Sequence, residues 1–142
     1  MSRSVMALDV GSKRIGVAVA DPSQTFAMPV ETIERTNLDA DLARIAAFVE
    51  SYRVGELVVG DPVTLSGERG IAATKMDAFV ERLRRVFQGP IHRVDERLTT
   101  AQATKTLIAA DVSRRKRKGA VDRLAAALIL ESCLGRRRNE RA

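Results

Sequence analysis

The 142-residue sequence predicts an α/β fold built on a mixed sheet of five strands. Three strand-like segments come first, at residues 5–10, 15–19 and 25–35, and strands then alternate with helices. Three strands followed by such alternation imply layers of helix and sheet in which the strands are not all parallel. The length fits one domain, residues 1–142.

The first two strands are predicted to form a hairpin that contains one acid. Asp9 is the only charge in the apolar run Val5–Val10, Gly11 and Ser12 supply the turn, and Ile15–Val19 returns as a nearly continuous apolar strand. An ionised carboxylate is costly to bury without a partner. Asp9 therefore requires a metal ion, a basic neighbour or a donor-rich loop, or else it hydrogen-bonds its own turn.

The third strand and the first helix follow. Pro29 interrupts the segment Thr25–Arg35, which favours an edge position because proline cannot donate a hydrogen bond to a neighbouring strand. Asn37 or Asp39 can cap a helix, and Gly55 fits the turn after it. The apolar residues of this helix recur at helical spacing: Leu38, Leu42, Ile45, Val49 and Tyr52.

Two more strands and two more helices complete the predicted body of the fold. A loop over residues 61–70 separates the buried strand Glu56–Gly60 from a second helix, and Ile91–Val94 forms the fifth strand. A further helix is predicted over about 99–110, with a threonine as its cap. The apolar face of the second helix consists of Ala72, Met76, Phe79, Val80, Leu83 and Val86.

Positive charge is concentrated in the C-terminal part of the chain. The net charge is +6, but residues 1–110 carry 14 basic and 14 acidic side chains, whereas residues 111–142 carry 10 and 4. We predict a flexible basic segment near 111–119, a helix from about 120 to 134 and a basic tail over 135–142. The clustering favours contact with nucleic acid over a merely solvated surface. A single Tyr and no Trp argue against stacking on single strands.

Composition excludes several other classes of protein. The hydrophobic fraction of 45% and the charged fraction of 30% are typical of a folded globular domain. No apolar run approaches the roughly 20 residues that span a bilayer, and the N-terminus has no signal-peptide pattern. Cys133, the single cysteine, excludes a disulfide framework, and we interpret it as a packing residue and His92 as a surface or core-edge residue. We expect a cytoplasmic protein without membrane contact, either a monomer or a weak homodimer.

Acids at three places in the sequence could form one site. Asp95 and Glu96 close the fifth strand, and Asp122 lies in the predicted first turn of the last helix. Together with Asp9 they occupy the strand ends and helix–sheet junctions where α/β proteins place ligands. Converging carboxylates repel each other unless a hard cation neutralises them. Each acid also has an ordinary explanation: an ion pair with Arg97 for the strand-end pair, and a favourable helix dipole for Asp122.

Four blocks of sequence carry a family resemblance and span nearly the whole chain in order. They are Leu8–Ala18, Val58–Pro62 with Gly67 after it, Asp95–Thr100, and Lys118–Ala126 with Ile129 and Leu130 after it. In these blocks the chain resembles the YqgF family, also called RuvX, which is similar to the RuvC Holliday-junction resolvases. The resemblance implies an RNase H-like fold of three layers, with helices on both faces of a five-stranded mixed sheet.

The resemblance also implies an activity. The family resembled is one of metal-dependent nucleases that hydrolyse phosphodiester bonds, associated with processing of the 5′ end of pre-16S ribosomal RNA. A resolvase of Holliday junctions or structured DNA on the same site is one alternative, and a non-catalytic RNA-binding ribosome-assembly factor is another. The cofactor would be one or two Mg²⁺ or Mn²⁺ ions, because two ions about 4 Å apart can activate water and stabilise the leaving oxygen.

Site residues follow from the resemblance by position. The catalytic and metal-binding residues would be Asp9, Glu96 and Asp122, with Asp95 less certain. Asp61 stands where the family usually has an aliphatic or aromatic residue, so it is either an additional ligand or a loop acid. Seven basic residues would contact substrate phosphates: Arg14, Arg97, Arg114, Arg115, Lys116, Arg117 and Lys118.

A nucleotide-binding protein of the actin or sugar-kinase type is a competing interpretation of the hairpin. Those proteins also open with an Asp-x-Gly-Ser or Asp-x-Gly-Thr hairpin, in which the turn cradles phosphate. They generally need two such domains to close around ATP, and 142 residues hold only one. The metal-site interpretation of Asp9 is therefore favoured.

Overall fold

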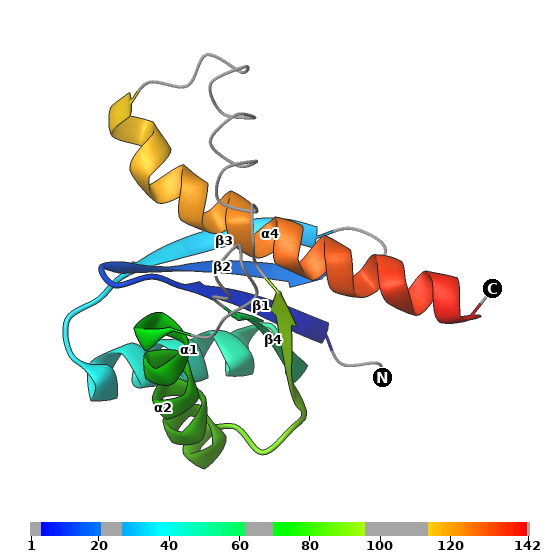
Figure 1. Ribbon diagram of the computed structural model, residues 1–142, viewed down its shortest axis with the longest axis horizontal. Coiled ribbons are helices and arrows are strands. Elements are labelled where there is room, and N and C mark those ends of the chain that lie inside the picture. The colour runs from blue at the N-terminus through cyan, green and yellow to red at the C-terminus, as the bar shows by residue number, and fades with distance from the viewer. Residues whose placement is uncertain (1–3, 21–26, 62–69, 96–113, 142) are drawn as a thin grey trace.

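The computed structural model describes residues 4–20, 27–61, 70–95 and 114–141. Within these ranges the strands and helices alternate as the sequence predicts (Figure 1). The elements in chain order are β1 (Ser4–Val10), β2 (Arg14–Ala20), β3 (Ala27–Glu34), α1 (Leu38–Ser51), β4 (Val54–Asp61), α2 (Ile71–Val86), β5 (Ile91–Asp95) and α4 (Arg114–Arg141). The helix predicted over about 99–110 lies outside the described residues.

The five strands form one mixed sheet in the order β3-β2-β1-β4-β5. β1 pairs antiparallel with β2, and β2 pairs antiparallel with β3. β4 lies parallel to both β1 and β5. β3 is an edge strand, as Pro29 predicts, and the register of β3 against β2 shifts between Val17 and Ala18, where Pro29 is the partner of Ala18. The predicted mixed sheet is confirmed.

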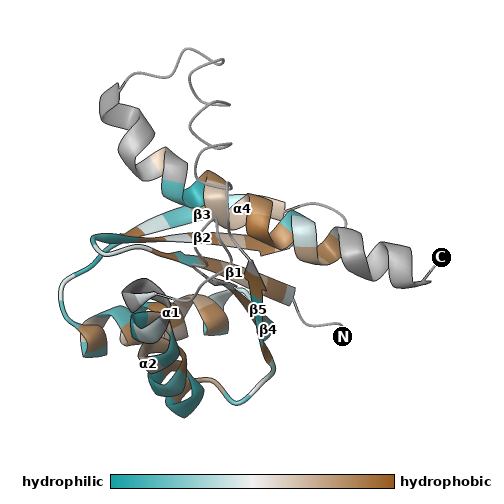
Figure 2. Cartoon of the chain, in the orientation of Figure 1, coloured by the Kyte–Doolittle hydropathy of each residue, from teal (hydrophilic) through white to brown (hydrophobic). Residues whose placement is uncertain are grey.

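Helices cover both faces of the sheet, which gives three layers (Figure 1). Side chains alternate along β1: Met6 and Leu8 pack with α1 and α2, whereas Val5 and Ala7 pack with α4. Figure 2 shows hydrophobic residues along the strands and the middle of α4, and hydrophilic residues on the outer side of α2. Among the described residues, no helix combines the length and the apolar character that crossing a bilayer requires.

Two local predictions around α1 and α2 need correction. The turn after α1 lies at Tyr52 and Arg53, where Arg53 has a φ of 51°, and Gly55 belongs to β4 instead. Val86 is 47% exposed, and the next residue, Phe87, is buried in its place. Phe87 has extended backbone angles because α2 ends at Val86, so its ring turns back toward the core.

The start of the last helix is the largest correction. α4 begins at Arg114 rather than near Ala120 and continues to Arg141, so the segments 114–119 and 135–141 are helical. Arg and Lys are good helix formers, and one glycine inside a helix costs only about 1 kcal/mol. Asp122 therefore lies well inside α4, and the predicted favourable interaction with the helix dipole does not apply, because that effect is confined to the first turn.

α4 lies directly against the sheet at Gly16 in β2. A Cβ atom added at Gly16 would lie 1.8 Å from the carbonyl oxygen of Asp122 and 2.9 Å from the amide nitrogen of Arg123. These atoms belong to the backbone of α4 and cannot move aside like a flexible side chain. Only a glycine at position 16 permits this crossing.

Replacing Gly16 should therefore destabilise the fold. We expect Gly16→Ala to lower the free energy of unfolding by about 1–3 kcal/mol, the usual cost of overpacking a tight core. Gly70→Ser is the control, because nothing lies within 4 Å of an added Cβ there. Urea denaturation monitored by circular dichroism measures both. A Gly16→Ala protein as stable as the wild type would contradict the close crossing.

Candidate active site

Asp9 occupies the face of the sheet that α4 covers. It follows Ala7 by two positions in β1 and is only 8% exposed. Its partner across the antiparallel pair with β2 is Gly16. Residues directly opposite each other in such a pair have Cα atoms about 4.5–5.5 Å apart and side chains on the same face. Asp9 therefore lies beside the point where α4 crosses.

Asp122 is the residue of α4 that lies over Gly16 at this crossing. Its backbone rests on Gly16, which places it next to Asp9 although the two acids are far apart in sequence. The neighbouring Arg123 donates from Nη1 to Oγ1 of Thr32 at 3.1 Å, which ties α4 to β3. The structure thus brings the backbones of two of the three acids expected to form the catalytic site to one crossing.

Arg14 is the immediate partner of Asp122. Its Nε donates to Oδ2 of Asp122 at 3.0 Å, and both side chains are partly buried. Burial raises the pKa of the Asp122 carboxyl above its ordinary value of 3.8, while the hydrogen bond and the charge of Arg14 act to lower it. The charge of Glu34 also raises this pKa, and that of Arg123 lowers it. Asp122 is thus a carboxylate in a desolvated place, held there by one guanidinium group.

Two other predicted acids stand at the ends of β4 and β5, the strands beside β1. Asp61 is the last residue of β4 and Asp95 the last of β5, and the two are partners in the parallel pair. β1, β4 and β5 run parallel, so their carboxyl ends share one edge of the sheet, which is where open α/β sheets bind ligands. The side chains of Asp61 and Asp95, and the whole of Glu96 and Arg97, lie outside the described residues.

The predicted phosphate-binding residues of the basic segment are the first residues of α4. They lie about 6–12 Å along the helix axis from Asp122, at a rise of about 1.5 Å per residue. Figure 1 shows these first turns of α4 extending beyond the sheet. Their side chains are not described; the residues are Arg114, Arg115, Lys116, Arg117 and Lys118.

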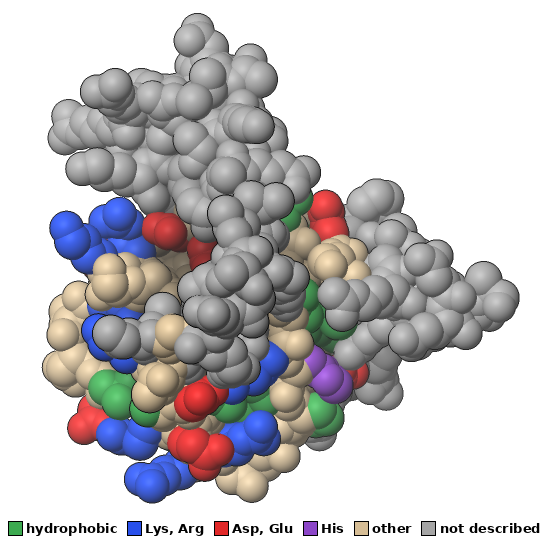
Figure 3. Space-filling model, viewed as in Figure 1, with side chains coloured by type: hydrophobic (Ala, Val, Ile, Leu, Met, Phe, Trp, Pro, Cys, Tyr) green, Lys and Arg blue, Asp and Glu red, His purple; other side chains and the backbone are tan. Residues whose placement is uncertain are grey.

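His92 and Cys133 stay apart from this site, as predicted. Nε2 of His92 lies 3.0 Å from Oε2 of Glu56 on the surface, and Cys133 of α4 packs against the core between α4 and the sheet. Within the part of the chain that the structure describes, no three His, Cys, Asp or Glu side chains form a group that could hold a metal ion. Figure 3 shows basic and acidic side chains intermingled over the visible described surface.

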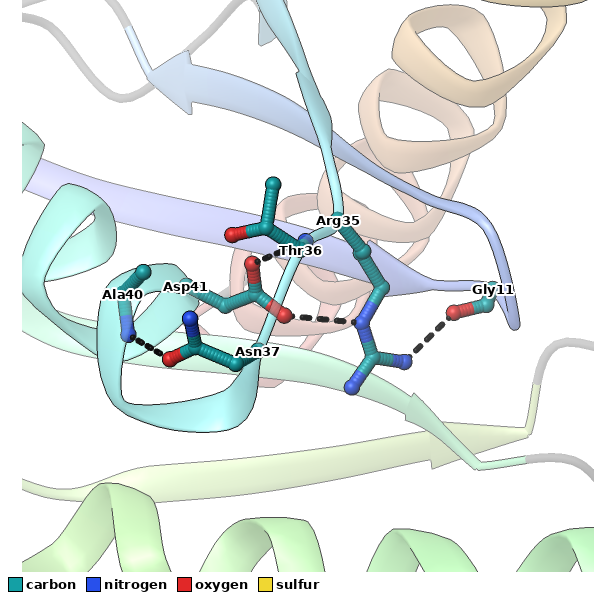
Figure 4. Close-up of polar contacts among 6 residues, drawn as sticks. All are labelled: Gly11, Arg35, Thr36, Asn37, Ala40 and Asp41. Atoms are coloured by element: carbon teal, nitrogen blue, oxygen red, sulfur yellow. Dashed lines mark hydrogen bonds and ion pairs between the residues drawn. The ribbon is translucent and has the colours of Figure 1, made fainter.

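A partly buried ion pair beside the hairpin turn was not predicted from the sequence. Nε of Arg35 donates to Oδ2 of Asp41 at 3.1 Å, and Nη1 of Arg35 donates to the carbonyl oxygen of Gly11 at 2.7 Å (Figure 4). Asp41 is 1% exposed. One sequence signal was available: Asp41 stands between Leu38 and Ile45 at helical spacing, so it lies on the apolar face of α1.

Comparisons with known proteins agree with this architecture. "Putative pre-16S rRNA nuclease" is the name of a Desulforudis audaxviator protein that is 44% identical over 137 residues, covering 96% of this chain and 97% of that protein. A Moorella thermoacetica protein of the same name is 46% identical over 132 residues, covering 93% and 94%.

A solved structure and a family model complete the comparison. The chain shares its fold with RuvC of T. thermophilus in complex with a Holliday junction substrate, with a TM-score of 0.61, 14% identity and 97% of each chain covered. The family model described as "RuvX: Holliday junction resolvase" matches residues 3–136. With this match and relatives above 40% identity, the chain belongs to the RuvX family.

Proposed function

We propose that this protein is a metal-dependent nuclease that hydrolyses phosphodiester bonds in the 5′-end processing of pre-16S ribosomal RNA. The observation that carries the proposal is the pair of acids at the crossing of α4 and β2, where Asp9 is buried opposite Gly16 and Asp122 rests on it. The names of the relatives in the same family support the choice of RNA. We also propose that the protein acts in the cytoplasm.

The donor set fits a hard divalent cation. Asp9 and Asp122 offer carboxylate oxygens in a desolvated place, and such oxygens are the ligands that Mg²⁺ and Mn²⁺ prefer. Asp9, Glu96 and Asp122 would hold the ion or ions, with Asp95 and Asp61 as further candidates. Bound there, the metal would neutralise these acids and stabilise the negative charge that develops on the phosphate.

The chain itself supplies orientation and substrate binding. Asp9 is fixed by the sheet and Asp122 by a helix whose backbone lies directly on Gly16, so the backbones of the two acids are held close together. Arg14 is placed to exchange Asp122 for a substrate phosphate, since guanidinium groups bind both anions. The basic residues at the start of α4 and Arg97 would follow the nucleic-acid backbone, with an affinity that falls as salt rises.

Cleavage of branched DNA is the second candidate function. It is favoured by the description of the family model and by the RuvC-like fold. Resolving a four-way junction takes two symmetric cuts, so this function requires a homodimer that presents two sites, whereas the RNA function is compatible with a monomer. Testing both substrates with the same variants separates the two.

Removing the charge of Asp9 tests the proposal directly. We expect Asp9→Asn to lower cleavage of a transcript spanning the 5′ end of 16S rRNA by at least about 100-fold in Mn²⁺, because the ion loses its buried ligand. Asp39→Asn is the control, since Asp39 is exposed on α1. Gel electrophoresis of labelled transcript and of a synthetic four-way DNA junction reports the products.

Two results would contradict the proposal. Cleavage by Asp9→Asn at the wild-type rate would remove Asp9 from the site. Binding of the transcript without cleavage by the wild type, unaffected by EDTA, would instead indicate a non-catalytic assembly factor.

The raised pKa of Asp122 predicts a pH dependence. A raised pKa means that Asp122 becomes protonated at a higher pH than an ordinary aspartate. As the pH is lowered, Mn²⁺ binding and cleavage should therefore begin to weaken at a higher pH than they would if this pKa were 3.8. The same shift links Asp122 to stability. Its contribution to the free energy of unfolding is fully present below the unfolded-state pKa and is lost as the pH rises through the folded-state pKa.

Arg14→Gln isolates the contribution of the guanidinium group. Because Arg14 lowers the pKa of Asp122, its removal should move the titration midpoint of the Asp122 carboxyl to still higher pH. The carboxyl ¹³C chemical shift measured against pH in metal-free protein gives both midpoints. A wild-type midpoint at or below 3.8, or a downward move in Arg14→Gln, would contradict the desolvated position of Asp122.

A further inference from the structure

The hairpin turn after Asp9 is held by Arg35, which comes directly after β3. Nη1 of Arg35 donates to the carbonyl oxygen of Gly11 at 2.7 Å, and its backbone amide donates to the carbonyl oxygen of Lys13 at 2.9 Å. The turn is closed within itself by the Gly11 amide, which donates to the carbonyl oxygen of Arg14 at 2.8 Å. Arg35 therefore contacts both arms of the turn.

Arg35 is itself anchored on the face of the sheet that α1 and α2 cover. Nε of Arg35 donates to Asp41, whose other oxygen accepts from the amide of Thr36 at 3.1 Å (Figure 4). The guanidinium carbon lies 5.7 Å from the centre of the Phe79 ring in α2. The planar fork of one side chain thus connects the turn to α1 and α2.

The turn connects the two acids of the candidate site. Asp9 precedes Gly11 by two residues in β1, and Arg14, whose carbonyl closes the turn, holds Asp122 through its side chain. A shift of the turn therefore displaces Asp9 and the partner of Asp122 together. The bonds to Asp41 and the Asn37 cap lie at the start of α1, whereas the bond from Arg35 to Gly11 reaches the turn beside the candidate site.

We propose that Arg35 is a positioning residue of the nuclease, which fixes the Gly11–Arg14 turn so that Asp9 and Asp122 keep their separation. The proposal rests on the proposed function of the same site. It assigns to Arg35 a role exerted through the backbone of Gly11, without contact with the substrate or the metal. Misplacement of catalytic groups by about 1 Å costs up to roughly 100-fold in rate.

Arg35→Lys is the sharpest variant. Lysine keeps the positive charge beside buried Asp41, so the fold avoids an unpaired buried charge. A single ammonium group does not reproduce the planar fork that bonds Asp41 and Gly11 at once. Arg82→Lys is the matched control, because Arg82 pairs with Asp39 between α2 and α1 and does not contact the turn.

The expected result combines kinetics with local dynamics. Arg35→Lys should lower kcat on the 16S transcript by roughly 10–100-fold with little change in KM. Hydrogen exchange of the Gly11 amide should become faster by on the order of tenfold. Amides at the centre of β1 and β4 should keep their exchange rates. Arg82→Lys should match the wild type in both measurements. Asp41→Asn, which leaves the Gly11 bond in place, should lower stability at least as much as Arg35→Lys but lower kcat less.

Several outcomes overturn the proposal. An unchanged kcat, an unchanged Gly11 exchange rate, or a faster exchange spread evenly over the sheet would each remove Arg35 from a positioning role. The same holds if the losses of kcat in Arg35→Lys and Asp41→Asn simply follow their losses of stability. If the wild type cleaves neither RNA nor DNA, the proposed function fails, and the exchange of the Gly11 amide alone then supports or overturns the fixing of the turn by Arg35.

Discussion

The contact between the backbone of α4 and the hydrogen side chain of Gly16 is the constraint on which the rest of the site depends. Gly16 is the strand partner of Asp9, and the carbonyl group of Asp122 occupies the space that any larger residue at position 16 would fill. The crossing therefore joins two acids distant in sequence and buries the surface between them. Close packing at this point determines both how firmly α4 is held on the sheet and how close the backbones of the two acids lie.

The electrostatics of the site follow from that packing. Burial removes water from Asp122 and disfavours its charged form, and Arg14 compensates in part. A site in this condition gains from a divalent cation, which supplies the positive charge that solvent no longer screens. On the proposed function, Arg14 would then leave Asp122 and bind a substrate phosphate. The desolvation of Asp122 would thus favour binding of the cation, and through the release of Arg14 it would favour binding of the anionic substrate.

Local patterns predicted most of the sheet and the position of Asp9. Pro29 marked the edge strand, Asn37 was one of two expected caps, and the apolar run around Asp9 indicated a buried acid. The start of α4 was missed because a run of basic residues has no apolar period to signal a helix. The pairing of Arg35 with Gly11 and of Arg14 with Asp122 depends on how distant segments meet in space, which local sequence does not encode.

The proposed function requires that Asp9 and Asp122 share a divalent cation. Crystals of the wild-type protein soaked in Mn²⁺, with anomalous diffraction data, test it most directly. The account predicts an anomalous peak about 2.1 Å from carboxylate oxygens of both Asp9 and Asp122, with the Arg14 guanidinium group moved away from Asp122. Saturating Mn²⁺ with no peak between these acids, and with Arg14 still paired to Asp122, would contradict it.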